Sequence, residues 1–149
     1  MKLRQVYNEF IRIYLKKENN RIIDLDVEDE KYVWITDGVS VWGIPKENPF
    51  NFEKMHAKWF KELADEGLPV TKITRSPYRD AKDLIKLEAE KEKVSMYLDE
   101  KKLKWFDKDY GLRISKEPLG RIGLMCQVYE DGELRGLILG VDIADSRKF

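Results

Sequence analysis

Apolar residues recur every three or four positions over the first part of the chain. Leu3, Val6, Phe10 and Ile11 fall on one face at this spacing, whereas charged residues such as Arg12 fall largely on the other. This period is typical of an amphipathic helix that packs one side against a core. We therefore predict a helix over residues 2–18 that covers a sheet.

The pattern then changes from a helical period to alternation. Residues 23–28 alternate between an apolar and an acidic side chain, which is typical of a half-buried strand. The acidic members are Asp24, Asp26 and Glu28. With the two β-prone runs that follow, residues 21–44 are predicted to form a three-stranded meander.

The run KYVWITDGVSVWGIP, residues 31–45, is apolar and β-branched on both sides of an Asp-Gly pair. A two-residue Asp-Gly loop suits a type I′ turn, because both central residues of that turn need a positive φ. The sequence therefore predicts a tight hairpin with its turn at residues 37–38.

The register set by that turn makes the hairpin apolar on both faces. Trp34 would lie opposite Val41 on one face, and Val33 opposite Trp42 on the other. A hairpin with one wet face should alternate between apolar and polar residues, so both faces need a cover. We expect the rest of the chain to supply it, and the alternative is a partner interface at Trp34, Val41 and Trp42.

Two further helices are predicted in the middle of the chain. Asn51 is a candidate N-cap for the first, and Gly67 supplies its stop. Its apolar face would hold Met55, Trp59, Phe60 and Leu63. After a short strand over residues 70–74, the second would begin with the Ser-Pro pair at residues 76–77, with an apolar stripe that extends from Tyr78 to Ala89.

The last third of the chain returns to strand patterns, and an Asp-Gly pair at residues 131–132 predicts a second hairpin. A two-residue loop there would set Tyr129 opposite Leu134, and Cys126 opposite Leu137. The strands are expected near residues 94–98, 103–106, 112–114, 123–129 and 134–143. Residues 144–149 are expected to be a frayed polar tail.

This order of elements predicts an α+β fold. The strands cluster in meanders and do not alternate with helices, so the sheet should be largely antiparallel, with two Asp-Gly hairpins and about three helices as cover. No linker-like segment divides the 149 residues, so residues 1–149 are expected to form one domain. Each half also places a helix before a meander with an Asp-Gly turn.

Composition narrows the function classes. The chain has 28 Lys and Arg against 28 Asp and Glu, and this balance counts against phosphate neutralisation as the main function but leaves room for a local patch. A single cysteine indicates a reducing compartment. Without a run of membrane-spanning length or a signal-peptide core, the sequence predicts a cytoplasmic protein without a membrane partner.

His56 and Cys126 are the only histidine and the only cysteine. Two ligands do not complete a tetrahedral zinc site, and Cys126 lies in an apolar run where a buried, inert thiol is expected. A Cys-His nucleophile pair is the alternative reading of the same two residues. We expect no cofactor.

The acidic strand offers a second candidate chemistry. If Asp24, Asp26 and Glu28 project from one face of one strand, their carboxylates would suit Mg²⁺ or Mn²⁺, and the chain would be a metal-dependent hydrolase. The alternative is that these are the solvent-facing residues of an amphipathic strand.

Basic and aromatic residues interleave in the run from residue 101 to residue 113, KKLKWFDKDYGLR. Ammonium and guanidinium groups there would contact a nucleic-acid backbone, and an aromatic ring would stack on a base. The candidate contacts are Lys101, Lys102, Lys104, Trp105, Tyr110 and Arg113. The alternative is a surface hairpin with one face in the core.

Two stretches resemble parts of a known family. Residues 32–44, with the turn Thr36-Asp37-Gly38, resemble a hairpin of bacterial DNA sliding-clamp domains, and residues 133–143, ELRGLILGVDI, resemble the last strand of that family. The combination is also similar to small proteins of phages and mobile elements. The resemblance implies a clamp-like α+β fold that self-associates and has no enzymatic activity.

Together these patterns predict a non-enzymatic cytoplasmic interaction module, clamp-like and of phage or mobile-element type, that binds a protein partner or a second copy. A nucleic-acid-binding protein and a metal-dependent hydrolase are the alternatives.

Overall fold

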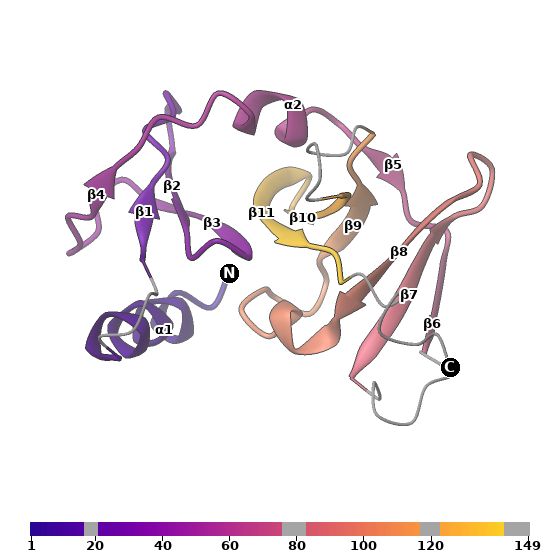
Figure 1. Cartoon of the computed structure of the whole chain (residues 1–149), viewed down its shortest axis with the longest axis horizontal. Helices are drawn as coiled ribbons and strands as arrows, with labels where there is room; N and C mark the ends of the chain where they lie inside the picture. The colour runs from indigo at the N-terminus through magenta and orange to yellow at the C-terminus, as the bar shows by residue number, and fades with distance from the viewer. Residues whose placement is uncertain (17–20, 76–82, 117–122, 142–149) are drawn as a thin grey trace.

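Eleven strands form two sheets in the computed structural model, which describes residues 1–16, 21–75, 83–116 and 123–141 (Figure 1). The larger sheet has eight strands in the order β4-β1-β2-β3-β11-β10-β9-β5, and the smaller one has the order β6-β7-β8. All strand pairs are antiparallel except β1 and β4. The predicted α+β class is therefore confirmed.

The strands are short, and their bounds follow. The larger sheet consists of β1 (Ile23–Asp24), β2 (Tyr32–Thr36), β3 (Ser40–Pro45), β4 (Glu53–Lys54), β5 (Leu68–Pro69), β9 (Gly111–Ile114), β10 (Met125–Glu130) and β11 (Glu133–Leu139). The smaller sheet consists of β6 (Lys72–Arg75), β7 (Leu84–Ala89) and β8 (Val94–Asp99).

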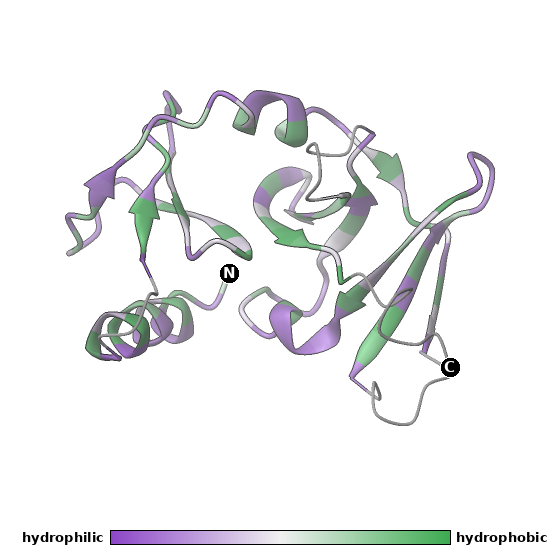
Figure 2. Cartoon of the chain, in the orientation of Figure 1, coloured by the Kyte–Doolittle hydropathy of each residue, from purple (hydrophilic) through white to green (hydrophobic). Residues whose placement is uncertain are grey.

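Two α-helices and one 3₁₀ helix accompany the sheets in the described residues. They are α1 (Leu3–Leu15), α2 (Phe60–Ala64) and the 3₁₀ helix η2 (Glu100–Leu103). Figure 1 shows α1 and η2 on one side of the larger sheet, with the N-terminus between them, and α2 on the opposite side. In Figure 2, green and purple residues alternate along α1, as its amphipathic sequence requires.

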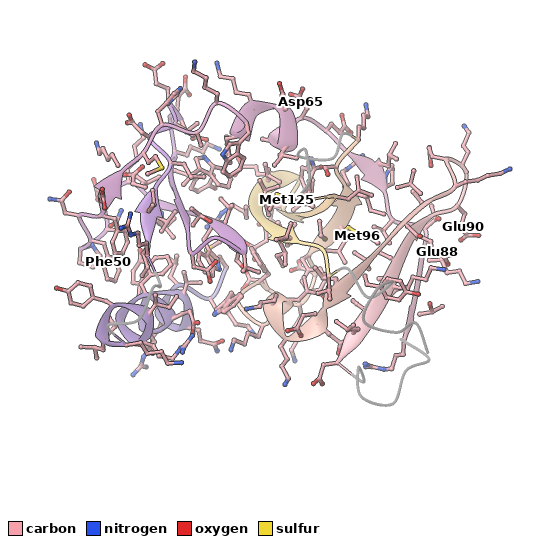
Figure 3. The ribbon with its side chains drawn as sticks, viewed as in Figure 1. Phe50, Asp65, Glu88, Glu90, Met96 and Met125 are labelled. Atoms are coloured by element: carbon pink, nitrogen blue, oxygen red, sulfur yellow. The ribbon has the colours of Figure 1, made fainter. Side chains whose placement is uncertain are left out.

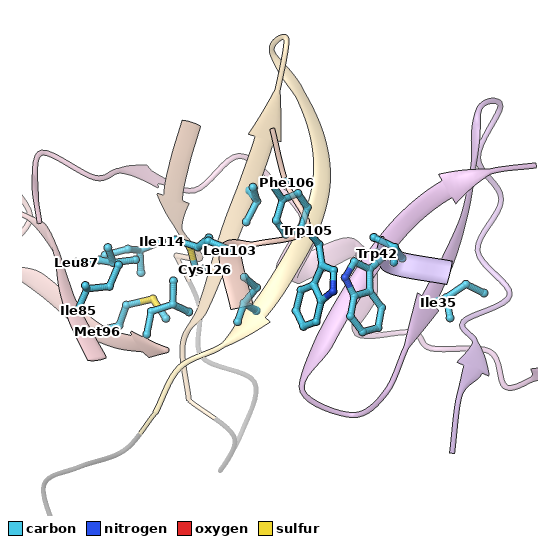
Figure 4. Packing of buried hydrophobic residues seen from close by; sticks show 14 of the residues in the cluster. Ile35, Trp42, Ile85, Leu87, Met96, Leu103, Trp105, Phe106, Ile114 and Cys126 are labelled. Atoms are coloured by element: carbon cyan, nitrogen blue, oxygen red, sulfur yellow. The ribbon is translucent and has the colours of Figure 1, made fainter. Parts of the chain in front are cut away.

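The larger sheet separates two apolar clusters, and each contains one tryptophan of the central hairpin. Trp42 packs with Phe10 of α1 and with Trp105, whose ring lies edge-on at 5.2 Å (Figure 4). Trp34 packs on the other face against Phe60 of α2, with ring centroids 4.9 Å apart. The prediction that the chain itself covers both faces of the hairpin is confirmed.

The register of this hairpin differs from the predicted one by two residues. Trp34 lies opposite Gly43, not opposite Val41, because the loop takes in Val39 and Ser40. The Asp37 carboxylate accepts hydrogen bonds from the backbone N–H groups of Val39 and Ser40, at 2.9 and 2.7 Å, and so closes a longer turn. A shift of two residues leaves every side chain on its predicted face.

In the second hairpin, the turn residues Asp131 and Gly132 have φ values of 53° and 78°. Tyr129 lies opposite Leu134, but a bulge between Val128 and Tyr129 shifts the pairing beyond it. Cys126 therefore lies opposite Ile138 instead of the predicted Leu137.

Two of the three predicted helices were wrong in extent or in type. The second was expected from Asn51, but α2 is only five residues long and a short strand, β4, precedes it. The third was expected to reach residue 89, yet residues 84–89 form β7, and residues 76–82 lie outside the described part of the chain. Residues 103–106, expected as a strand, belong to η2 and the turn after it.

Residues 84–89 were predicted wrongly because their apolar positions fit both the period of a helix and the alternation of a strand. Ile85, Leu87 and Ala89 are buried at alternating positions, and each pairs with a residue of β8. Leu84 and Ile85 also satisfy a helical stripe with earlier residues, which is the pattern that misled the prediction. Pairing with β8 decides for the strand, because it buries three side chains on one face.

The strand order of the larger sheet has an internal symmetry. β1, β2 and β3 follow α1 in sequence, and β9, β10 and β11 follow η2; in space they are arranged β1-β2-β3-β11-β10-β9. β3 and β11 meet antiparallel at the centre. The two sets of three strands, each preceded in sequence by a helical element, are therefore arranged in mirrored order about this central pair.

Candidate nucleic-acid interface

The start of α1 is fixed to the segment that follows η2. The backbone N–H of Lys2 donates to the carbonyl oxygen of Trp105 at 2.7 Å. The amino group of Met1 lies 2.6 Å from carboxylate oxygens of Asp107 and Glu130. Buried Glu130 also accepts a hydrogen bond from the backbone N–H of Asp107 at 2.7 Å. The start of α1 is thus held beside the segment that follows η2.

Basic residues concentrate on these two segments, although the whole chain is neutral. Residues 1–16 and 100–108 hold eight Lys and Arg against three Asp and Glu, whereas residues 21–66, which include α2, hold six against eleven. We call the eight basic side chains the basic face. They are Lys2, Arg4, Arg12, Lys16, Lys101, Lys102, Lys104 and Lys108.

Most of the basic face has no acidic partner in the part of the chain that the structure describes. Arg12 pairs with Glu9 in the preceding turn of α1, and Lys101 pairs with Asp83 at 3.1 Å. The other six side chains form no ion pair within residues 1–16, 21–75, 83–116 and 123–141. Their charges are therefore available to an anionic ligand.

Glu9 interacts with basic groups of α1 and of the segment around η2. A hydrogen bond from Arg12 lowers the pKa of Glu9, and the positive charges of Lys104 and Lys102 lower it further, while partial burial opposes them. The same contact raises the pKa of the Arg12 guanidinium. The lysines beside η2 thus act on α1 as well as on solvent.

The sequence had predicted that Trp105 stacks on a base. The structure excludes this contact, because Trp105 is only 2% exposed. It lies instead under two cations: the ammonium groups of Lys102 and Lys104 are 5.7 and 5.0 Å from the ring centroid. This contact positions both lysines by a cation–π interaction. The buried ring therefore supports the cations and makes no direct contact with a ligand.

A surface hollow of about 280 Å³ opens next to these lysines. Lys2, Lys104 and Lys108 contribute positive charge and Glu100 one negative charge, and half-buried Tyr110 lies on its wall. Burial raises the pKa of Tyr110, so its hydroxyl stays protonated and can donate a hydrogen bond at neutral pH. Among the predicted nucleic-acid contacts, Tyr110 thus lies near Lys104.

Arg113 lies apart from the basic face. Its guanidinium donates to the carbonyl oxygen of Gly67 at 2.9 Å, pairs with Glu66 at 3.2 Å and lies over the ring of Tyr129. Through these contacts, Arg113 connects β9 with the segment that follows α2. It is removed from the proposed set of contacts, because its charge is already neutralised.

The interface predicted at Trp34, Val41 and Trp42 is not at the surface. The three residues are 3%, 1% and 0% exposed, because α2 covers one face of the hairpin and α1 the other. The doubly apolar hairpin therefore gives no reason for a partner at these positions.

The acidic strand does not form as predicted. β1 ends at Asp24, and Asp26 has a φ of 53°, so the alternation of one strand face is broken there. The Asp24 carboxylate accepts a hydrogen bond from the backbone N–H of Asp26 at 2.8 Å. Within the described residues, no three His, Cys, Asp or Glu side chains gather in a way that suits a metal ion. The geometry therefore gives no support to the hydrolase hypothesis at Asp24, Asp26 and Glu28.

His56 and Cys126 occupy unrelated environments. His56 is exposed, and its Nδ1 lies 3.0 Å from the carbonyl oxygen of Asp26. Cys126 is fully buried in β10, and burial raises the pKa of its thiol. A neutral, enclosed thiol is a weak nucleophile, as the apolar run around it had indicated.

Sequence reasoning missed the basic residues of α1, and it did not name Lys108 as a candidate contact. For contact with nucleic acid it considered only the basic run of residues 101–113, which acidic residues interrupt, and it interpreted the first helix as a cover for the sheet, because Glu9 and Glu18 interrupt its basic residues. A charge count over the whole first helix would have shown a second basic segment, but only the fold places the two segments together.

No protein-family model, curated protein or solved structure matches the chain. Among the described residues, no helix combines the length and the hydropathy that crossing a bilayer requires.

Proposed function

We propose that the chain is a non-enzymatic, clamp-like binding module whose basic face contacts the backbone of a nucleic acid. The observation that carries this proposal is the segregation of charge in a neutral chain. Two helical elements, α1 and η2, lie on one side of the larger sheet, and together with the residues that flank them they carry eight basic side chains (Figure 1). Clustering of Lys and Arg on one face is the electrostatic signature of nucleic-acid binding.

The chemistry of this face favours phosphate over base recognition. Its charged groups are mostly lysines, which act as mobile point charges and lack the rigid bidentate geometry of arginine. Trp105 is enclosed, and Tyr110 is half-buried, so stacking on bases contributes little. Binding should therefore be insensitive to sequence and strongly dependent on salt.

The resemblance to sliding-clamp domains supports the same assignment. That resemblance rests on the hairpin at residues 32–44 and on the run at residues 133–143, and in the fold β3 and β11 are neighbours at the centre of the larger sheet. A module of this size does not surround a duplex alone, so the clamp-like reading includes self-association.

The direct test is a fluorescence anisotropy titration of labelled duplex and single-stranded DNA of about 30 nucleotides at low salt. We expect saturable binding that is lost as salt is raised. Lys104→Glu with Lys108→Glu should weaken binding, and Lys58→Glu with Lys61→Glu, which are equally exposed on the α2 side, should not. Absence of binding by the unaltered protein at low salt would remove the proposal.

A second candidate, protein docking through α1, is favoured by a separate observation. Ile11, Tyr14 and Leu15 are 48%, 78% and 69% exposed and lie within two turns on the outer side of the helix. Large apolar side chains grouped in this way mark protein contacts. Basic residues flank them, and the acidic run at residues 24–30 of a second copy has the complementary charge.

Sedimentation equilibrium tests this candidate. If a second copy docks on α1, the protein should associate in a salt-sensitive manner, and Tyr14→Ser with Leu15→Ser should shift it toward the monomer. Met55→Ser, at a comparably exposed apolar residue elsewhere, is the matched control. A strictly monomeric protein at high concentration would rule out docking through α1 and the self-association that the clamp-like reading includes, and would leave only the contact of the basic face with a nucleic-acid backbone.

A further inference from the structure

The outer edge of β6 is open over its four residues in the described part of the chain. The larger sheet ends in β4 and β5, which have two residues each, and β5 contains Pro69. At the outer edge of β8, one residue has a partner among the described residues: the backbone N–H of Val141 donates to the carbonyl oxygen of Tyr97 at 2.8 Å. By contrast, no strand within the described ranges pairs with the outer edge of β6. Proteins usually shorten or cover such edges, so β6 stands out.

Pairing with β7 keeps β6 in an extended conformation. All four residues of β6 pair with β7, in the register Ile73 opposite Leu87 and Thr74 opposite Lys86. Thr71 anchors the start of the strand, because its backbone N–H donates to the carbonyl oxygen of Glu88 at 2.8 Å. Figure 3 labels Glu88 at this end of the smaller sheet. A partner would meet a strand that is already formed, which lowers the entropy cost of binding.

We propose that β6 is a docking edge for an extended, acidic segment of a partner protein, which adds to the smaller sheet as an antiparallel fourth strand. Backbone hydrogen bonds would supply affinity, and the side chains of β6 would supply selectivity. This proposal is independent of the basic face, since β6 is not part of it.

The two basic residues of β6 favour a partner strand with acidic residues. Its sequence, KITR, places Lys72 and Arg75 at its ends and has no acidic residue. Both side chains are exposed, and within the described residues Arg75 pairs with one carboxylate, that of exposed Glu100, at 3.3 Å. Opposite charges directly across two strands stabilise the pairing. The docking strand should therefore carry acidic residues opposite Lys72 and Arg75.

Ile73, the apolar residue between these charges, is packed on one side and exposed to solvent on the other. Ile73 is 54% exposed, although it shares a sheet face with buried Leu87 and Met96. A valine or isoleucine across from Ile73 would extend this apolar row by one strand and bury the exposed part of Ile73. An antiparallel strand that meets all these conditions contains the order glutamate, threonine, valine, glutamate.

A second copy of the chain is a poor occupant of this edge. In the antiparallel register that pairs all four residues of two β6 strands, Lys72 of one copy lies opposite Arg75 of the other. Like charges in that position destabilise strand pairing. Basic residues on an edge also prevent the edge-to-edge association of identical chains. The charges that exclude self-pairing are the ones that attract an acidic segment.

The test uses an end-capped peptide with glutamate, threonine, valine and glutamate at its centre, titrated into the full chain by calorimetry. We expect saturable binding, together with slower amide hydrogen exchange in β6. Lys72→Glu with Arg75→Glu should weaken binding by about tenfold or more, because two attractive pairs become repulsive. Lys58→Glu with Lys61→Glu should leave binding unchanged.

A second peptide separates strand addition from simple charge attraction. Backbone N-methylation at alternate residues keeps the charges but removes the hydrogen-bond donors that a strand needs. If the N-methylated peptide binds as well as the parent, or if neither binds the folded protein, the proposal is overturned. Circular dichroism of each charge variant establishes that β6 variants remain folded.

Discussion

The side-chain amide of Gln127 donates a hydrogen bond to the carbonyl oxygen of Asp65, with 2.6 Å between the nitrogen and oxygen atoms. The same nitrogen donates to the carbonyl oxygen of Leu63 at 2.6 Å, and the Gln127 carbonyl oxygen accepts from the backbone N–H of Gly67 at 2.9 Å. Gln127 is fully buried. One side chain on β10 therefore holds the end of α2 against the larger sheet.

Replacing Gln127 by Leu should destabilise the fold strongly. The substitution keeps the side-chain size but leaves buried backbone groups of Leu63 and Gly67 without partners, at a cost of about 2–4 kcal/mol. Urea unfolding followed by tryptophan fluorescence measures this loss. Gln5→Leu, at an exposed position on α1, is the control and should change the free energy of unfolding by less than about 0.5 kcal/mol. Equal effects of the two substitutions would contradict the assigned role of Gln127.

Gly136→Ala should also destabilise the protein, for a steric reason. A Cβ atom at Gly136 would lie 2.3 Å from the ring of Phe106 and 3.0 Å from the carbonyl oxygen of Val41. Relieving this overlap in a packed core costs about 1–3 kcal/mol. Gly111→Ala is the matched control in a strand, since the nearest atom there, on Tyr129, is 3.9 Å away. A thermal unfolding midpoint that is unchanged in the Gly136 variant would show that β11 does not approach Phe106 so closely.

Asp29 should contribute stability that is lost in acid. Partial burial alone would raise the pKa of Asp29, but hydrogen bonds from the Trp34 indole and from the backbone N–H groups of Lys31 and Tyr32 outweigh it and hold the pKa below its ordinary value. A carboxylate with a lowered folded-state pKa stabilises the fold above its unfolded-state pKa of about 4, and this contribution disappears as the pH falls through the folded-state value.

The measurement is the free energy of unfolding between about pH 6 and pH 3 for the unaltered chain and for Asp29→Asn. The decline in acid should be less steep in the variant, because the asparagine cannot take up a proton. Parallel curves for the two proteins would mean that Asp29 has the same pKa in the folded and unfolded states.

Cys126 should be unreactive toward thiol reagents as long as the protein is folded. Its side chain is enclosed in β10, and burial raises the pKa of the thiol, so little thiolate forms at neutral pH. Labelling with a chromogenic disulfide should be slow in buffer and fast and stoichiometric in denaturant. Rapid labelling of the native protein would place Cys126 at the surface.

Much of the fold could be predicted from local patterns. The first helix, the two-sided character of the central hairpin and the α+β class follow from the spacing of apolar residues and from an Asp-Gly pair. The hairpin register could not be predicted, since it depends on the Asp37 carboxylate bonding to Val39 and Ser40. Residues 84–89 could not be assigned either, because only pairing with β8 distinguishes their two periods.

The candidate site depends more heavily on tertiary structure. The basic run near Trp105 was visible in the sequence, but the burial of that ring and the nearness of α1 were not. Gln127 gave no signal in the sequence, because an isolated polar residue in an apolar strand looks like one on a solvent-exposed face. Its role appears only once the end of α2 lies against β10.

The measurement that tests the basic face most directly is the salt dependence of DNA binding. For the unaltered chain, the logarithm of the binding constant should fall linearly with the logarithm of salt concentration, and Lys104→Glu with Lys108→Glu should reduce the slope by about two, since two phosphate contacts are lost. Lys58→Glu with Lys61→Glu should reproduce the slope of the unaltered chain. A slope that is the same in all three proteins would contradict the assignment of the α1 and η2 surface to nucleic acid.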